Sequence, residues 1–221
     1  LIDESSKRIV LKNIFDPTKL PIPKSIEKMF LMATSMLSDV IQAFIASDKH
    51  LAQDIIERDF EVDKVYLAIL RQLNSFRENL VSEEQLGIEA IGINFYENVA
   101  TQLERIADHS VTVSKQIVSL ETMGAKEQKE TIMQADKATA HKTIQLLKNA
   151  KVMVETLDKK LAHSLIDTCT EIEKNKEAFI LATIENSLDR IRGYIINIAE
   201  MTIDLAVVKE NKALTKTGLT S

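Results

Sequence analysis

Two pairs of carboxylates at four-residue spacing are the residues of this chain best placed to do chemistry. The first pair is Asp59 and Asp63, and the second is Glu104 and Asp108. Residues i and i+4 lie one turn apart on the same side of a helix, so each pair would present two carboxylates side by side. Both pairs interrupt apolar stripes, where an ionised carboxylate without a partner is costly to bury. Four such groups together predict a bound cation.

The chemistry of this donor set is that of a hard, oxygen-rich site. Carboxylate oxygens favour Mg²⁺, Ca²⁺, Mn²⁺ or iron over a structural zinc. A cluster of several cations would carry more positive charge than four carboxylates neutralise. A phosphate bridging the metals is therefore a further hypothesis.

Salt bridges offer an alternative explanation for the same carboxylates. Asp59 and Asp63 would then lie at a partly solvated edge, and Glu104 and Asp108 would form ion pairs between helices. The cations nearest in sequence to the four acids are Arg58, Lys64 and Arg105.

Two neighbouring residues are predicted to play structural parts. His109 is one position past Asp108 and therefore turned about 100° away on a helix, which predicts a capping or surface histidine rather than a metal ligand. Tyr66 is predicted to pack on the helix seam with its hydroxyl hydrogen-bonded.

The elements that must position these groups are helices, because no proline occurs between Lys24 and Gly218. Apolar periodicity predicts a first helix from about Ser25, which would be its N-cap, and a second from Asp48 to about Phe76. A polar turn then precedes a third helix that ends near Gly124. The inner line of the second helix is predicted to be Ala52, Ile56, Asp59, Asp63, Tyr66 and Leu70.

The second half of the chain echoes the first. Asp48-Lys-His-Leu-Ala52 recurs as Asp158-Lys-Lys-Leu-Ala162, and Leu103-Glu-Arg-Ile106 recurs as Leu188-Asp-Arg-Ile191. The acidic positions decay in this second copy. Cys169 and Glu173 take the places of Asp59 and Asp63, while Asp189 and Gly193 take those of Glu104 and Asp108. A weaker second metal site, or none, is therefore expected there.

Composition excludes several classes of function. The net charge of −5 argues against nucleic-acid binding by this segment, because such binding needs a basic patch. The single cysteine, Cys169, excludes an internal disulfide and fits a reducing compartment. No uninterrupted apolar run approaches the roughly 18–20 residues of a membrane span. Because the chain begins at Leu1, we expect it to be a fragment of a longer protein.

Two motifs resemble those of the PhoU family of phosphate-uptake regulators. They are the runs Glu57–Lys64 and Leu103–His109, which match the family's pattern of an acidic residue, three others and then aspartate. Ala107 stands where the family commonly has glycine. The opening arm, residues 3–11 followed by Asp16-Pro17, resembles the link in archaeal members that fuse an AbrB-type DNA-binding domain to a PhoU region.

The resemblance implies an all-α fold of tandem three-helix bundles, with the second bundle degenerate. The implied divisions are an arm from a missing N-terminal domain over residues 1–24, a first bundle over 25–124, a second, degenerate repeat over 125–210, and a disordered tail over 211–221. The arm would connect the bundles to the missing domain.

The resemblance also implies a regulatory rather than a catalytic role in a cytoplasmic, phosphate-responsive protein. Its partners would be phosphate transporter components or signalling proteins, a second copy of the chain, and DNA only through the missing AbrB-type domain. The implied cofactor is a multinuclear iron or zinc cluster, with Mn or Mg as alternatives. The implied ligands are Asp59, Asp63, Glu104 and Asp108, with Cys169, Glu173 and Asp189 as doubtful ligands of a second site.

Two other classes of function are alternatives to a regulatory role. A ferritin-like di-metal oxidase would need Glu-x-x-His on two helices, and none of the four histidines follows a glutamate at that spacing. A purely structural helical adaptor, with salt-bridged carboxylates and no metal, remains open.

Overall fold

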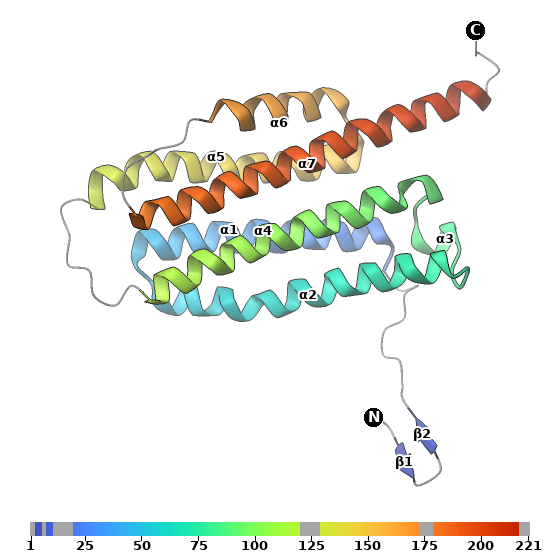
Figure 1. Ribbon diagram of the computed structural model, residues 1–221, viewed down its shortest axis with the longest axis horizontal. Helices are drawn as coiled ribbons and strands as arrows, with labels where there is room; N and C mark the ends of the chain where they lie inside the picture. The colour runs from blue at the N-terminus through green and yellow to red at the C-terminus, as the bar shows by residue number, and fades with distance from the viewer. Residues whose placement is uncertain (1–2, 6–7, 11–19, 120–128, 173–178, 217–221) are drawn as a thin grey trace.

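The computed structural model describes the backbone of residues 3–5, 8–10, 20–119, 129–172 and 179–216, and it confirms the predicted all-α fold of tandem three-helix bundles. In Figure 1 the helices of the first bundle lie below those of the second, with their axes roughly aligned. A short antiparallel hairpin precedes them, with Glu4 opposite Ile9. Within the predicted arm, residues 3–5 therefore pair with residues 8–10 as two short strands.

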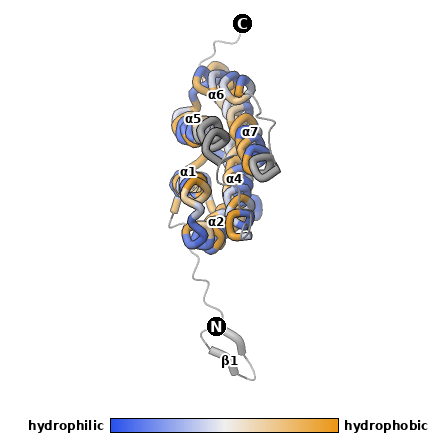
Figure 2. The backbone as a smooth tube through the Cα atoms, turned by 90° about the vertical axis from the view of Figure 1, so that its left-hand side faces the viewer, coloured by the Kyte–Doolittle hydropathy of each residue, from blue (hydrophilic) through white to orange (hydrophobic). Residues whose placement is uncertain are grey.

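The first bundle consists of three long helices and two short ones. They are α1 (Ile22–Ala46), α2 (Lys49–Arg77), α3 (Glu83–Leu86), the 3₁₀ helix η1 (Ala90–Gly92) and α4 (Ile93–Ser119). The second bundle is α5 (Lys129–Thr156), α6 (Lys159–Glu171) and α7 (Phe179–Lys216), and the hairpin is β1 (Asp3–Ser5) and β2 (Arg8–Val10). Viewed along the helices in Figure 2, α1 and α4 lie between α2 on one side and α5 and α7 on the other.

The first helix begins earlier than predicted. Its N-cap is Pro21, so Ile22 and Pro23 occupy its first turn, and Ser25 is a buried helical residue rather than a cap. A proline is tolerated there because the first backbone N–H groups of a helix have no intrahelical acceptor. The predicted apolar stripe of this helix is confirmed, and it forms the centre of the core.

Among the described helices, α1 alone is long and apolar enough to cross a membrane by length and composition, with a mean hydropathy of 1.6 in its most apolar window. This high mean hydropathy was not expected, because no long uninterrupted apolar run occurs in the sequence. The apolar stripe of α1 is buried against α2, α4 and α5. That arrangement is typical of the core helix of a helical bundle.

The junctions between the first two helices of each bundle confirm the internal repeat. Ser47 and Leu157 both adopt left-handed backbone angles, with φ of 54° and 52°. Each is followed by an aspartate that caps the next helix: Asp48 accepts a hydrogen bond from the Leu51 backbone N–H at 3.0 Å, and Asp158 accepts one from Leu161 at 3.1 Å. The same local sequence therefore makes the same turn twice.

The buried face of α2 differs in phase from the predicted inner line. The fully buried residues of this helix are Ala52, Ile55, Val62, Val65, Ile69, Gln72 and Leu73. Of the predicted line, Ala52 is buried, whereas Ile56 and the residues after it are half-buried. The aspartates therefore flank the seam and do not interrupt it.

Helix α7 spans both bundles and runs further than predicted. Residues 211–216, expected to be disordered, continue the helix to Lys216. The predicted end of the third helix near Gly124 and the end of the predicted tail at 217–221 lie outside the described residues. Towards its end α7 contacts the first bundle, where Lys212 pairs with Glu89 at 2.9 Å.

The two capping aspartates lead to a prediction about stability. Asp48→Ala and Asp158→Ala should each lower the free energy of unfolding by about 1 kcal/mol, because each removes the acceptor for an otherwise unpaired N–H in the first turn of a helix. Urea denaturation followed by circular dichroism would measure the change. Asp54→Ala, which alters an exposed carboxylate on α2, is the matched control, and an equal loss in that variant would contradict the capping role.

Candidate metal centre

The four predicted carboxylates lie on two neighbouring antiparallel helices that pack closely against each other. Asp59 and Asp63 project from α2, and Glu104 and Asp108 project from α4. The first three are half-buried, and Asp108 is exposed. The structure therefore brings both predicted pairs to one partly solvated strip between α2 and α4.

The carboxylates of α2 and those of α4 repel one another, as their pKa values show. Partial burial raises the pKa of Asp59, and the negative charges of Asp108 and Asp63 raise it further. Partial burial, followed by Asp108 and Asp63, has the same effect on the pKa of Glu104. The pKa of Asp108 is raised by partial burial of its carboxyl group and by Asp63. Each pair is thus within electrostatic reach of the other.

Among the described residues, the cations suggested as salt-bridge partners make other contacts. Arg58 pairs with Asp39 of α1 at 2.7 Å, and Lys64 pairs with Glu61 at 2.6 Å. The guanidinium of Arg105 lies 5.9 Å from the ring centre of Tyr194. The predicted pairing with Arg58 or Lys64 is therefore wrong.

Lys115, which the sequence analysis did not identify, also supplies positive charge near the strip. Lys115 lowers the pKa values of Asp59 and Asp108, although burial and repulsion outweigh it. Its position seven residues after Asp108, two turns along the same side of α4, is the signal that could have identified it. Arg105 makes a similar small contribution at Glu104.

The donor set suits a hard cation, but its geometry is open. Within the residues that the structure describes, no hydrogen bond or ion pair engages the carboxylate oxygens of the four acids. Over the same residues, no group of three or more His, Cys, Asp or Glu side chains is arranged closely enough to hold a metal ion. A cation here would be bound by drawing the carboxylates of α2 and α4 together.

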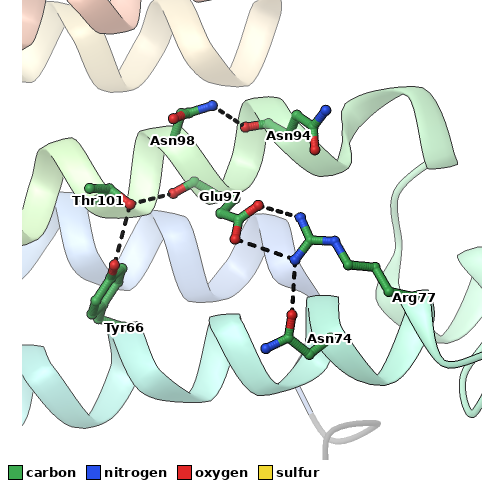
Figure 3. A network of polar contacts seen from close by, with 7 residues as sticks. All are labelled: Tyr66, Asn74, Arg77, Asn94, Glu97, Asn98 and Thr101. Atoms are coloured by element: carbon green, nitrogen blue, oxygen red, sulfur yellow. Dashed lines mark hydrogen bonds and ion pairs between the residues drawn. The ribbon is translucent and has the colours of Figure 1, made fainter.

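Contacts on one side of the strip hold α2 and α4 in register (Figure 3). The Tyr66 hydroxyl lies 3.4 Å from Thr101 Oγ1, which confirms the predicted hydrogen bond of that tyrosine. Further along, Arg77 of α2 pairs with Glu97 of α4 and also donates to Asn74 Oδ1 at 2.9 Å. These contacts fix which residues of the two helices face each other.

His109 differs from its prediction, because it is half-buried between α4 and α7. Its Nε2 lies 3.5 Å from the Tyr194 hydroxyl, and its buried Nδ1 has no hydrogen-bond partner among the described residues. Burial lowers the pKa of His109, with Asp108 opposing this effect and Arg190 adding to it. It is an interface residue and not a capping or surface one.

The doubtful second site has a different character. Cys169 is buried, and burial raises the pKa of its thiol to about 11. Asp189 pairs with Arg192 at 3.4 Å. Glu173 lies outside the described residues. The second half therefore presents a neutral thiol and a paired carboxylate where the first presents a cluster of acids.

Comparison with known proteins agrees with the resemblance read from the two motifs. Residues 26–117, which carry all four carboxylates, match the model of the PhoU domain. Two curated relatives, both named phosphate-specific transport system accessory protein PhoU homolog, come from two strains of Caulobacter vibrioides. Each is 31% identical over 118 residues, covering 53% of this chain and 48% of the relative. The chain thus spans about half the length of the curated relatives it matches.

A solved structure extends the similarity in fold beyond the matched domain. The phosphate transport system regulatory protein PhoU from Streptococcus pneumoniae superposes with a TM-score of 0.59 at 19% identity, covering 84% of this chain and 93% of that one. At this identity the comparison supports the tandem-bundle fold alone. Together with the domain match over residues 26–117 and the curated relatives, this likeness makes the chain similar to PhoU proteins in its first bundle and in its fold.

Proposed function

We propose that this chain is the phosphate-responsive regulatory region of a PhoU-type protein, and that it binds a multinuclear metal cluster through Asp59, Asp63, Glu104 and Asp108. The observation that carries the proposal is the strip of four mutually repelling carboxylates between α2 and α4. Such a strip is unfavourable without a cation and favourable with one. Iron, zinc, manganese or magnesium would supply the missing positive charge.

Binding would act on the packing of α2 against α4. A multivalent cation cancels the repulsion and draws the two pairs together, so metal loading stabilises this pair of helices. Phosphate would bridge metals whose charge exceeds that of the carboxylates. Bound phosphate would then change the surface that the strip between α2 and α4 exposes.

The proposed output is a protein contact and not a reaction. The curated relatives are named as accessory proteins of a phosphate-specific transport system. By analogy, this chain would act on phosphate transporter components or signalling proteins in the cytoplasm. It would work as a homo-oligomer, joined to DNA only through an AbrB-type domain at its N-terminal side.

A second candidate is a structural adaptor that binds no metal. The open arrangement of the carboxylates among the described residues favours it, because no finished coordination sphere is present there. The two candidates differ in metal content, so one measurement separates them.

Elemental analysis tests the metal site directly. The purified chain should contain stoichiometric iron, zinc or manganese, and an Asp63→Ala, Asp108→Ala double variant should lose it because one ligand is removed from each helix. Circular dichroism would verify that the variant is folded. Absence of metal from both proteins, even after reconstitution, would leave the adaptor.

Removing one of the repelling charges should have opposite effects with and without metal. In the metal-free chain, Glu104→Gln should raise the melting temperature by about 1–2 °C, because the pKa of Glu104 is raised by its surroundings and its charge is therefore unfavourable. In the metal-loaded chain the same change should lower the melting temperature, because a ligand is lost.

Differential scanning fluorimetry with and without EDTA measures both effects. Glu61→Gln, on an exposed acid already paired with Lys64, is the control. The same sign of change for Glu104→Gln under both conditions would count against metal binding.

Phosphate should alter the metal site if it bridges the cluster. Titrating phosphate into the iron- or cobalt-loaded chain should shift the absorption bands of the metal, and the same titration with chloride or sulfate at equal ionic strength should not. A spectrum unchanged by phosphate would argue that phosphate is not the ligand sensed.

A further inference from the structure

A buried guanidinium occupies the second half, next to the position that corresponds to Asp108 in the carboxylate strip of the first. Arg192 of α7 is 2% exposed and is among the largest fully buried side chains of the described residues. An arginine is almost never buried in this way without a partner. Its surroundings therefore call for an explanation.

The hydrogen bonds of Arg192 reach α5 and α7, and its charge acts on a thiol of α6. Its Nη2 donates to Asp189 Oδ1, one turn earlier on α7, at 3.4 Å, and its Nη1 donates to Thr143 Oγ1 of α5 at 3.5 Å. On α6 the nearest effect is on Cys169, where the arginine's charge lowers the pKa of the thiol against the larger effect of burial. The guanidinium thus lies among α5, α6 and α7.

The internal repeat gives this position its meaning. The motif Leu103–Ile106 aligns with Leu188–Ile191, so Arg192 corresponds to Ala107 and Gly193 to Asp108. Ala107 is fully buried and small. Where the first half has a small residue followed by a carboxylate, the second half has a buried cation followed by no side chain.

We propose that the second half holds no metal, and that the guanidinium of Arg192 provides there the positive charge that a bound cation provides in the first half. Asp189, the acid of the second copy that corresponds to Glu104, is then neutralised from within the chain. A multivalent cation and a fixed guanidinium at one partly buried site would repel each other strongly. The comparison with the first half rests on the proposed function, but the exclusion of metal from the second half does not.

The first half of the chain would then respond to metal, and the second half would not. The Arg192–Asp189 pair within α7 would be present whether or not metal is bound. Loading with metal would therefore reorganise α2 against α4 while α6 and α7 keep their packing. The second bundle would act as the fixed frame for changes in the first.

Two substitutions are enough to recreate the first-half pattern in the second. Arg192→Ala with Gly193→Asp gives Asp189 followed by alanine and then aspartate at the spacing of Glu104, Ala107 and Asp108. Open space surrounds position 193, because a Cβ placed on Gly193 meets no atom within 4 Å. Cys169 of α6, on whose thiol the charge of Arg192 acts, would supply a further donor once zinc displaces its proton.

The experiment is a zinc titration in a background that lacks Asp63 and Asp108, both changed to alanine, so that the first half does not contribute. Adding Arg192→Ala and Gly193→Asp to that background should create binding of about one Zn²⁺ per chain. The matched control adds Gly193→Asp alone, which supplies the same new carboxylate but keeps the guanidinium, and it should bind no zinc. Circular dichroism and melting temperature would verify folding of each variant.

Three results would overturn the proposal. They are equal zinc binding in the control, no zinc binding in the folded variant that lacks Arg192, and metal that remains in the background chain but is lost with Asp189→Ala. Failure of the proposed function would be seen separately, as absence of metal from the unaltered chain. The zinc titration decides the role of Arg192 in either case.

Discussion

The burial of α4 on two sides is the constraint on which the rest of the structure depends. This helix packs against α1 and α2 within the first bundle and against α7 of the second. Leu103, Ile106 and Ala107 are fully buried, and Gln102 on another side accepts a hydrogen bond from Asn197 of α7 at 3.1 Å. Only a narrow strip of α4 remains for charged side chains. Glu104 and Asp108 fall on that strip, and α2 places Asp59 and Asp63 beside it.

Packing holds the carboxylates together against their own repulsion. The apolar contacts between α2 and α4, together with the Arg77–Glu97 pair and the Tyr66–Thr101 contact, fix the register of the two helices. The helices therefore cannot slide to separate the acids. Because the carboxylates are still partly solvated, water screens much of the unfavourable energy. The strip is thus tolerable without metal.

Much of this arrangement could be predicted from local sequence. Helical periodicity, the capping aspartates and the short connections place α1, α2 and α4 as neighbours, and the i, i+4 spacing then brings the carboxylates to one face. Which face of α2 is buried could not be predicted as reliably. The predicted inner line through Ile56, Asp59 and Asp63 is half-buried. The buried residues in this part of α2 are Ile55, Val62 and Val65.

Contacts between the two halves could not be predicted, because they depend on how the bundles pack. The sequence around His109 indicates a helix face and does not indicate that α7 covers it, so its contact with Tyr194 was unexpected. Arg192 was missed for the same reason. An arginine in a helix is usually exposed, and its burial follows only once α5 and α6 are known to close around it.

The two bundles show how one fold can treat the same electrostatic problem in two ways. A repeat that carries acids between two packed helices must supply positive charge or lose the acids. The second half keeps an acid at two of the four positions, Glu173 and Asp189, and pairs Asp189 with a buried guanidinium. The first half keeps four and has no fixed cation paired with them among the described residues. A bundle whose acid is paired with a fixed cation keeps the same packing. A bundle whose acids need an exchangeable cation would change its packing with the supply of that cation. Responsiveness in this chain should therefore reside where the internal counter-ion is missing, between α2 and α4.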